Sequence, residues 1–168
     1  MSDTIRILGI DPGSQITGFG IVDVHGTVTK PVRWGGIETS GDHSARLKDI
    51  FLALGKIVVE FQPAEIAIER VFLHRNADSA LKLGQARAAA LCATFDADVP
   101  IFEYTARHIK KAVVGRGSAD KEQVQHMIRM ILAIREDIQE DAADALAAAL
   151  CHAHERGTRN ILDRVAGT

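Results

Sequence analysis

The sequence predicts an α/β protein in which helices flank one mixed sheet of five strands, an antiparallel meander followed by parallel strands. Two patterns support this prediction. Three short strand-like segments come first and are separated by turn residues, which is typical of a meander. Strand-like and helix-like segments then alternate, which indicates strands joined through helical crossovers. A chain of 168 residues is long enough to bury a core, so we expect one domain.

The meander is expected over residues 5–11, 16–24 and 27–39. The period of apolar residues changes after it, and Leu47, Ile50 and Leu54 recur at the spacing of a helix over 44–61. The later elements are a strand, a helix, a strand and two helices, expected at 65–70, 78–95, 99–104, 119–134 and 140–154. The last residues show weak patterning. We therefore divide the chain into a domain of residues 1–155 and a flexible tail of residues 156–168.

Composition argues against a membrane protein. The chain is 46% hydrophobic and 25% charged, as globular proteins are, and no apolar run reaches the roughly 18 residues of a membrane span. Its first residues lack the layout of a signal peptide. Cys92 and Cys151 each stand alone in Ala-rich sequence, which indicates small buried thiols in a reducing compartment. We expect a cytoplasmic protein with no membrane partner.

Four acids end elements that this topology can bring to one edge of the sheet. Asp11 and Glu69 end the first and fourth strands, and Asp141 and Asp144 share one side of the last helix. Singly, each has an ordinary explanation as a turn acid, a strand-end surface acid or a helix first-turn acid. Together they would repel one another unless a cation lay among them. Hard oxygen ligands favour Mg²⁺, with Mn²⁺ as a substitute, and two ions about 4 Å apart would suit phosphodiester hydrolysis.

A local basic stretch is hidden by the overall net charge of −2. Residues 105–121 contain one acid, Asp120, and five cations, Arg107, Lys110, Lys111, Arg116 and Lys121. A solvated basic face is one interpretation. The other is a phosphate-binding surface, because a turn before a helix start presents backbone N–H groups to an anion.

The chain resembles the RuvC family of bacterial Holliday-junction resolvases from about residue 5 to residue 155. The resemblance rests on four segments in order, LGIDPGSQITGFGIV, AIERVFLHRNADSALKLGQARAAA, FEYTARHIKKAVVGRGSADKEQVQHMI and DAADALAAAL. It implies an RNase H-like fold, catalytic roles for the four acids, and a homodimer that makes two symmetric nicks in concert with a branch-migration motor of the RuvA and RuvB type. It also implies that Lys110 and Lys121 contact DNA near the scissile phosphate.

Residues after Glu69 are further candidates for DNA contact. Phe72 is either a core residue or an exposed platform at an unpaired base, and the resemblance favours a wedge at the junction centre. Arg75 and the neighbouring His74 and Asn76 could contact phosphates or bases, although they depart from the family pattern. His152 and His154 do not share a helix face, so they make a poor metal pair.

The second helix carries a stripe of small residues, Ala80, Gly84 and Ala88. Such a stripe can lie against the sheet. A protein that cuts two strands of a four-way junction needs a two-fold partner, so we predict that this stripe is the dimer interface.

Alternative functions remain at this point. A kinase or ATPase of the actin-like class needs two lobes, which 168 residues cannot hold. A non-catalytic junction-binding protein and a related nuclease that acts on RNA stay open.

Overall fold

A five-stranded mixed sheet forms the centre of the molecule. The structure is a computed structural model that describes residues 4–70 and 76–166. The strands lie in the order β3-β2-β1-β4-β5. Their bounds are β1 Ile5–Asp11, β2 Ile16–His25, β3 Val28–Glu38, β4 Glu65–Arg70 and β5 Ile101–Thr105. The first three strands pair antiparallel, and β4 pairs parallel with both β1 and β5, which confirms the predicted fold class.

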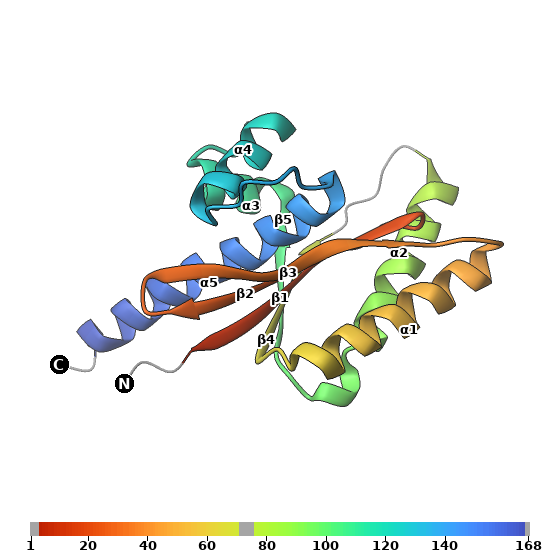
Figure 1. Cartoon of the computed structure of the whole chain (residues 1–168), viewed down its shortest axis with the longest axis horizontal. Coiled ribbons are helices and arrows are strands. Elements are labelled where there is room, and N and C mark those ends of the chain that lie inside the picture. Colours follow the sequence, from red (N-terminus) through yellow and green to blue (C-terminus); the bar gives the residue numbers. More distant parts are fainter. Residues whose placement is uncertain (1–3, 71–75, 167–168) are drawn as a thin grey trace.

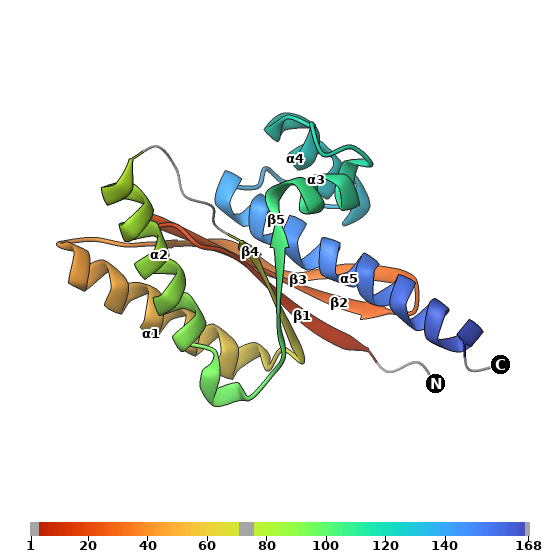
Figure 2. The same cartoon turned by 180° about the vertical axis from the view of Figure 1, so that it is seen from behind.

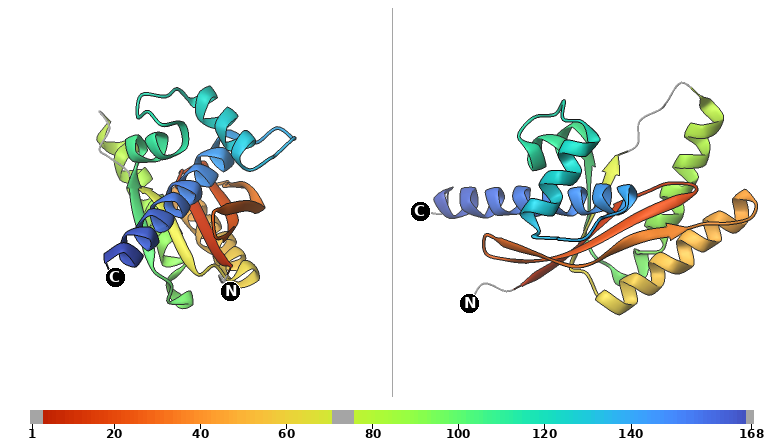
Figure 3. Two further views of the ribbon diagram at one scale, coloured as in Figure 1. Left: turned by 90° about the vertical axis from the view of Figure 1, so that its left-hand side faces the viewer. Right: turned by 45° about the horizontal axis from the view of Figure 1, so that its top comes forward.

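Helices cover both faces of this sheet. Their bounds are α1 His43–Phe61, α2 Ala77–Cys92, α3 Ala106–Val114, α4 Lys121–Ile131 and α5 Glu140–Ala166, with a short 3₁₀ helix η1 at Phe95–Ala97. Helices α1 and α2 cover one face, and α5 crosses the other (Figures 1 and 2). Helices α3 and α4 lie against the N-terminal half of α5 (Figure 3). The part of the chain described here contains no helix long and apolar enough to span a membrane.

Side chains alternate along β1 and so contribute to two separate cores. Ile7 packs with the residues under α5, whereas Leu8 and Ile10 pack with those under α1 and α2. Asp11 therefore lies on the α5 side of the sheet, as the alternation predicts. Glu65, Ala67 and Glu69 share the corresponding face of β4.

Glycines let α5 approach the sheet closely. A Cβ atom at Gly9 would clash with the carbonyl oxygen of Ala145, and one at Gly18 would clash with that of Asp141. Only glycine can occupy these two positions without moving the helix. The N-terminal half of α5 is thereby held next to the ends of β1 and β2.

Several expected details were wrong. The sequence reasoning did not predict α3, a helix of nine residues with two buried side chains, Ile109 and Val113. So short a segment shows little periodicity. The last helix does not end at residue 154 but continues through 156–166, and Cys92 is exposed, whereas Cys151 is buried as expected. The mobility of residues 156–168, and hence the division of the chain at residue 155, stays a prediction.

Candidate active site

Four carboxylates come from three elements that meet at one edge of the sheet. Ile10 pairs in register with Ile68, and the acids Asp11 and Glu69 follow these residues directly. The two strands are parallel, so their C-terminal ends lie at the same edge. Helix α5 begins above this edge, and its first turns carry Asp141 and Asp144. The predicted convergence of the four acids is observed.

The acids line a cavity of about 440 Å³. Its walls come from the ends of β1 and β4, the start of α5, and the helices α3 and α4. The residues that line it are Asp11, Glu69, Ala106, Ile109, Lys110, Lys121, Val124, Glu140, Asp141, Asp144 and Ala147. All four predicted acids and two of the five cations of residues 105–121 are therefore in one site.

The carboxylates disfavour one another's ionisation. Burial, followed by repulsion from Asp144, Glu69 and Asp141, raises the pKa of Asp11 to about 8. Burial and the charge of Asp144 also raise the pKa of Glu69. Burial likewise raises the pKa of Asp144, although Lys121 acts against the shift. These shifts mark a cluster of negative charge that the protein alone does not neutralise.

The donor set fits a divalent cation of the hard type. All four acidic groups offer carboxylate oxygens, which Mg²⁺ and Mn²⁺ prefer. Within residues 4–70 and 76–166, no three His, Cys, Asp or Glu side chains are grouped closely enough to hold a metal ion as they stand. The acids surround the cavity without closing on a common point.

Two lysines oppose the acids from the helical side of the cavity. Lys110 projects from α3, and Lys121 is the first residue of α4. A capping box formed by Asp120 and Gln123 fixes the start of α4 and hence the position of Lys121. Lys121 pairs with Glu140, which lines the same cavity. The site thus combines a carboxylate cluster with two cations that can face a phosphate.

The other predicted DNA contacts lie outside the cavity or outside the described residues. Arg107, Lys111 and Arg116 are exposed and do not line it. Phe72 and Arg75 fall in the segment 71–75, which is outside the described residues, and so does His74.

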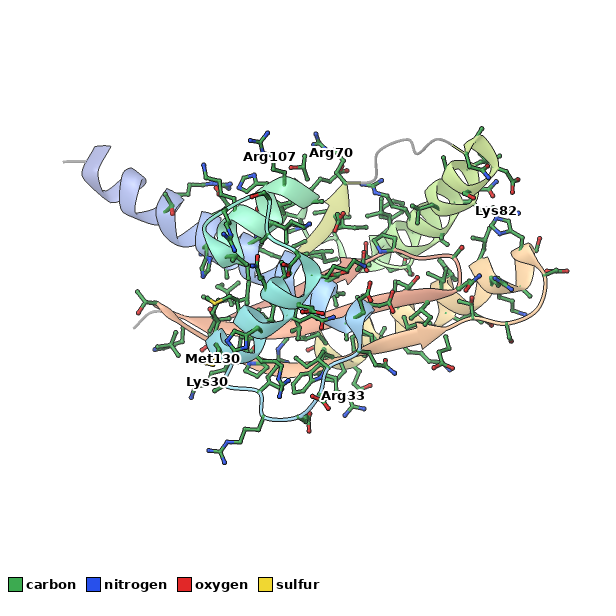
Figure 4. The ribbon with its side chains drawn as sticks, turned by 90° about the horizontal axis from the view of Figure 1, so that it is seen from above. Lys30, Arg33, Arg70, Lys82, Arg107 and Met130 are labelled. Atoms are coloured by element: carbon green, nitrogen blue, oxygen red, sulfur yellow. The ribbon has the colours of Figure 1, made fainter. Side chains whose placement is uncertain are left out.

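Sequence reasoning missed two charged neighbours of the acids, Arg70 and Glu140. Each is adjacent in sequence to a predicted acid, which is the signal that could have found it. Arg70 is exposed and pairs in register with Thr105, close to the start of α3. Figure 4 shows Arg70 and Arg107 projecting from the same edge of the molecule. Arg70 therefore adds an exposed cation next to the predicted basic stretch, and Glu103 pairs with it at 3.5 Å.

The small-residue stripe of α2 does not lie against the sheet. The buried residues of this helix are Ala86 and Ala90, whereas Gly84 and Ala88 are exposed and Ala80 is half-buried. A Cβ atom at Gly84 would meet no atom within 4 Å. The interpretation of the stripe as a contact with the sheet is therefore wrong.

A larger groove of about 750 Å³ lies between α1 and the end of α2. Its walls are mostly apolar and include Phe51, Leu52 and Val59. It contains none of the four converging acids, so we place the chemistry in the smaller cavity.

A mixed sheet in this strand order, with carboxylates at the ends of two parallel strands and on the helix that crosses them, defines an RNase H-like nuclease. The model of the family "Crossover junction endodeoxyribonuclease RuvC" matches residues 7–152. A relative of that name from Methylococcus capsulatus is 52% identical over 163 residues, covering 95% of this chain and 97% of the relative. The chain belongs to the RuvC family and is a crossover junction endodeoxyribonuclease.

Solved structures agree with this assignment. The RuvC of Thermus thermophilus in complex with a Holliday junction substrate is similar, with a TM-score of 0.86 and 34% identity. That similarity covers 92% of this chain and 96% of the Thermus chain.

Proposed function

We propose that the acidic cavity is the catalytic centre at which this endodeoxyribonuclease hydrolyses a phosphodiester bond of a four-way DNA junction. The observation that carries the proposal is the convergence of Asp11, Glu69, Asp141 and Asp144 on one cavity, where the pKa of Asp11 is raised to about 8 by burial and by the other three carboxylates. Repulsion among clustered carboxylates does not stabilise a fold, whereas a site that binds a divalent cation needs such a cluster as its ligands.

The four acids would hold divalent cations, Mg²⁺ in our proposal, with Mn²⁺ as a substitute and two ions per site. When bound, such ions activate a water molecule and stabilise the leaving oxygen of a phosphodiester. The acids come from β1, β4 and α5, so the fold presets their directions before the ions arrive. Water attacks phosphorus and gives up a proton, the bond from phosphorus to the leaving oxygen breaks, and the leaving oxygen takes up a proton.

Lys110 and Lys121 would hold the phosphate against the acids. Both line the cavity. Burial is the main cause of the raised pKa of Glu69, and the charges of both lysines act against that rise. The ion pair between Lys121 and Glu140 keeps this ammonium at the rim, where an entering phosphate can compete for it. Arg107, Lys111, Arg116 and Arg75 would follow the DNA backbone outward, and Phe72 would act at the unpaired bases of the junction.

A homodimer would present two such cavities to one junction. We propose that α2 forms the dimer interface, because Gly84 and Ala88 leave an exposed surface with room for a second backbone. Exposed Leu81 adds apolar area to the same helix. Two-fold symmetry would then give the paired, symmetric nicks. We place the protein in the bacterial cytoplasm with a branch-migration motor as its partner.

One experiment tests the proposal against its alternatives. The protein is incubated with a synthetic mobile four-way DNA junction, a linear duplex, and an RNA–DNA hybrid, each with Mg²⁺ and with a chelator. We expect paired nicks in the junction alone, and only with Mg²⁺. Binding without cleavage at any metal concentration would indicate a non-catalytic junction-binding protein, and preferential cleavage of the hybrid would indicate an RNA-directed nuclease.

A further inference from the structure

A buried polar network lies between the middle of α5 and the start of β4, away from the acids. His152 is 1% exposed, and its Nε2 atom is 2.7 Å from Glu65 Oε2. Its Nδ1 atom is 2.6 Å from the hydroxyl of Tyr104. Arg156 donates to Glu65 at 3.2 Å, and the ring of Phe102 stacks on the imidazole with centroids 4.2 Å apart. The cleavage chemistry uses none of these groups.

The direction of each hydrogen bond in the network follows from its chemistry. Burial lowers the pKa of His152, although Glu65 acts against the shift, so we treat the ring as neutral. A carboxylate can only accept, so Nε2–H donates to Glu65. Nδ1 is then left to accept the hydroxyl hydrogen of Tyr104. Each polar atom of the imidazole has one partner in a set place, which makes the contact directional.

The network joins the same elements that carry the acids. Helix α5 holds His152 and Asp144, eight residues apart, which corresponds to a rise of about 12 Å. Strand β4 holds Glu65 and Glu69 on one face, four residues apart, which corresponds to about 13 Å. The two spans are similar in length, so the His152–Glu65 contact at one end contributes to how far Asp144 lies from Glu69 at the other. Tyr104 adds β5, where it pairs in register with Glu69 itself.

The rest of this interface is apolar packing. Leu146 and Leu150 are fully buried there, and the backbone of α5 at Ala145 approaches Gly9 closely. Apolar burial is non-directional, so it holds the helix against the sheet without assigning a specific polar partner to any position along it. Repulsion among the acids at one end favours displacement of the helix. A directional contact at the other end opposes it.

We propose that Glu65, His152 and Tyr104 are positioning residues that hold α5 in register with β4 and so set the spacing of the acids toward divalent cations. This inference rests on the proposed catalytic role of the acidic cavity. Outer partners of metal ligands change metal affinity by about 10-fold to 100-fold. We expect the lower end of this range, because the network acts through the helix and not on a carboxylate directly.

The test compares four variants. Glu65→Ala removes the acceptor of His152, Glu65→Gln keeps an acceptor, and Tyr104→Phe removes one hydroxyl while it keeps the ring. Ile66→Val is the matched control, because it removes one buried methylene from the opposite face of the same strand. Each variant is measured for thermal unfolding against Mg²⁺ concentration, metal-free junction affinity, and single-turnover cleavage against Mg²⁺ concentration.

We expect Glu65→Ala to raise the Mg²⁺ concentration that gives half of the thermal shift by about tenfold, with a similar loss of cleavage rate. Tyr104→Phe should show the same change to a smaller degree. Metal-free junction affinity should stay at the wild-type value, and Glu65→Gln should restore the wild-type Mg²⁺ dependence. If Glu65→Ala does not fold, the comparison of the Mg²⁺ dependence of Tyr104→Phe with that of Ile66→Val decides whether the network positions the acids.

The inference is overturned if Glu65→Ala and Tyr104→Phe show the same Mg²⁺ dependence as Ile66→Val, since the network would then only stabilise the fold. It is also overturned if Glu65→Gln and Glu65→Ala behave alike. Asp144→Asn is run in parallel. An Asp144→Asn protein that keeps both its Mg²⁺ shift and its cleavage would refute the proposed acidic site, whatever the network variants show.

Discussion

Single residues decide the chemistry of this site through their surroundings. Asp11 ends a strand and precedes a proline, as many turn acids do. Burial under the fold and three carboxylate neighbours from β4 and α5 raise its pKa to about 8, so this shift has no local cause in the sequence. Sequence reasoning could name all four acids, because each lies near the end of a recognisable strand or in the first turns of a recognisable helix. It could not give the strength of their repulsion, which depends on distances across the fold.

Substitution of Asp11 by Asn separates chemistry from folding. The change keeps the shape of the side chain but removes one ligand charge, so cleavage should fall by about 100-fold or more. Metal-free junction affinity should hold or rise, because one negative charge that faces phosphates is gone. Asp137→Asn, at a fully exposed side chain, is the control. Loss of cleavage, binding and thermal stability together would mean that Asp11 is structural.

The stability of the metal-free protein should depend on pH through Asp11. Its folded-state pKa is raised from 3.8 to about 8, so the folded state holds this proton more tightly than the unfolded state does. Stability from this group is present at low pH and is lost as the pH rises through that window. The Tm of Asp11→Asn relative to that of the wild type should therefore rise between about pH 4 and pH 8, by on the order of 5 °C. Above about pH 8 the difference in Tm should not increase further.

Thermal unfolding of both proteins at a series of pH values with a chelator checks this prediction. Mg²⁺ should shrink the difference between the two proteins at pH 8, because the cation relieves the repulsion in the wild type. A Tm difference that is constant across the pH series would contradict the shifted pKa.

Among the elements, α3 and α4 supply the cations and α2 supplies an exposed face. Helix α3 was missed, since a helix of nine residues with two buried positions resembles a polar loop in the sequence. Two residues in the sequence could have indicated this helix. The side chain of Thr105 caps its start, and Gly115 ends it with a positive φ. This helix places Lys110, and not its neighbour Lys111, at the cavity.

The two cavity lysines should each contribute one phosphate contact. Lys110→Ala and Lys121→Ala are expected to weaken junction binding and to lower the slope of log affinity against log salt by about one each. Lys30→Ala on β3 is the control, since Lys30 lies on the far side of the molecule from Arg70 and Arg107 (Figure 4). Titrations at several salt concentrations measure the slopes, and unchanged slopes would remove both lysines from the DNA surface.

The exposed stripe of α2 can be tested without touching the acids. Gly84→Glu puts a bulky charge where a partner helix would lie, so it should shift the protein towards monomer and abolish paired nicking. Single nicks by the monomer should persist. Val28→Glu, at an exposed site of the β2–β3 hairpin, should leave the dimer intact. A Gly84→Glu protein that sediments as a full dimer would place the interface elsewhere.

Over the whole molecule, the sheet separates two faces with different roles. The face under α1 and α2 contains a core cluster of apolar side chains, whereas α5 brings acids, small residues and the His152 network to the other. The acids meet only if both strands and α5 are in place. Cation binding should therefore stabilise the entire fold.

Mg²⁺ should raise the unfolding temperature of the wild type in a saturable manner, and a chelator should reverse the rise. The stabilisation at a Mg²⁺ concentration 100 times the Kd should be about 2.7 kcal/mol. Asp144→Asn should lose most of this shift, and an equal ionic strength of NaCl should not reproduce it. An equal Mg²⁺ shift in the wild type and in Asp144→Asn would contradict a cation site at these acids.

The sequence by itself determined the order and type of nearly all the elements, the side of β1, β4 and α5 on which each acid lies, and the identity of the four acids. Period and turn chemistry are local properties, so they can be read along the chain. Only the tertiary structure decided how closely α5 approaches Gly9 and Gly18, which lysines reach the acids, that Gly84 faces outward, and that His152 bonds to Glu65 and Tyr104. These depend on packing between segments far apart in sequence, where a shift of a few ångströms changes both the contacts and the charges that meet.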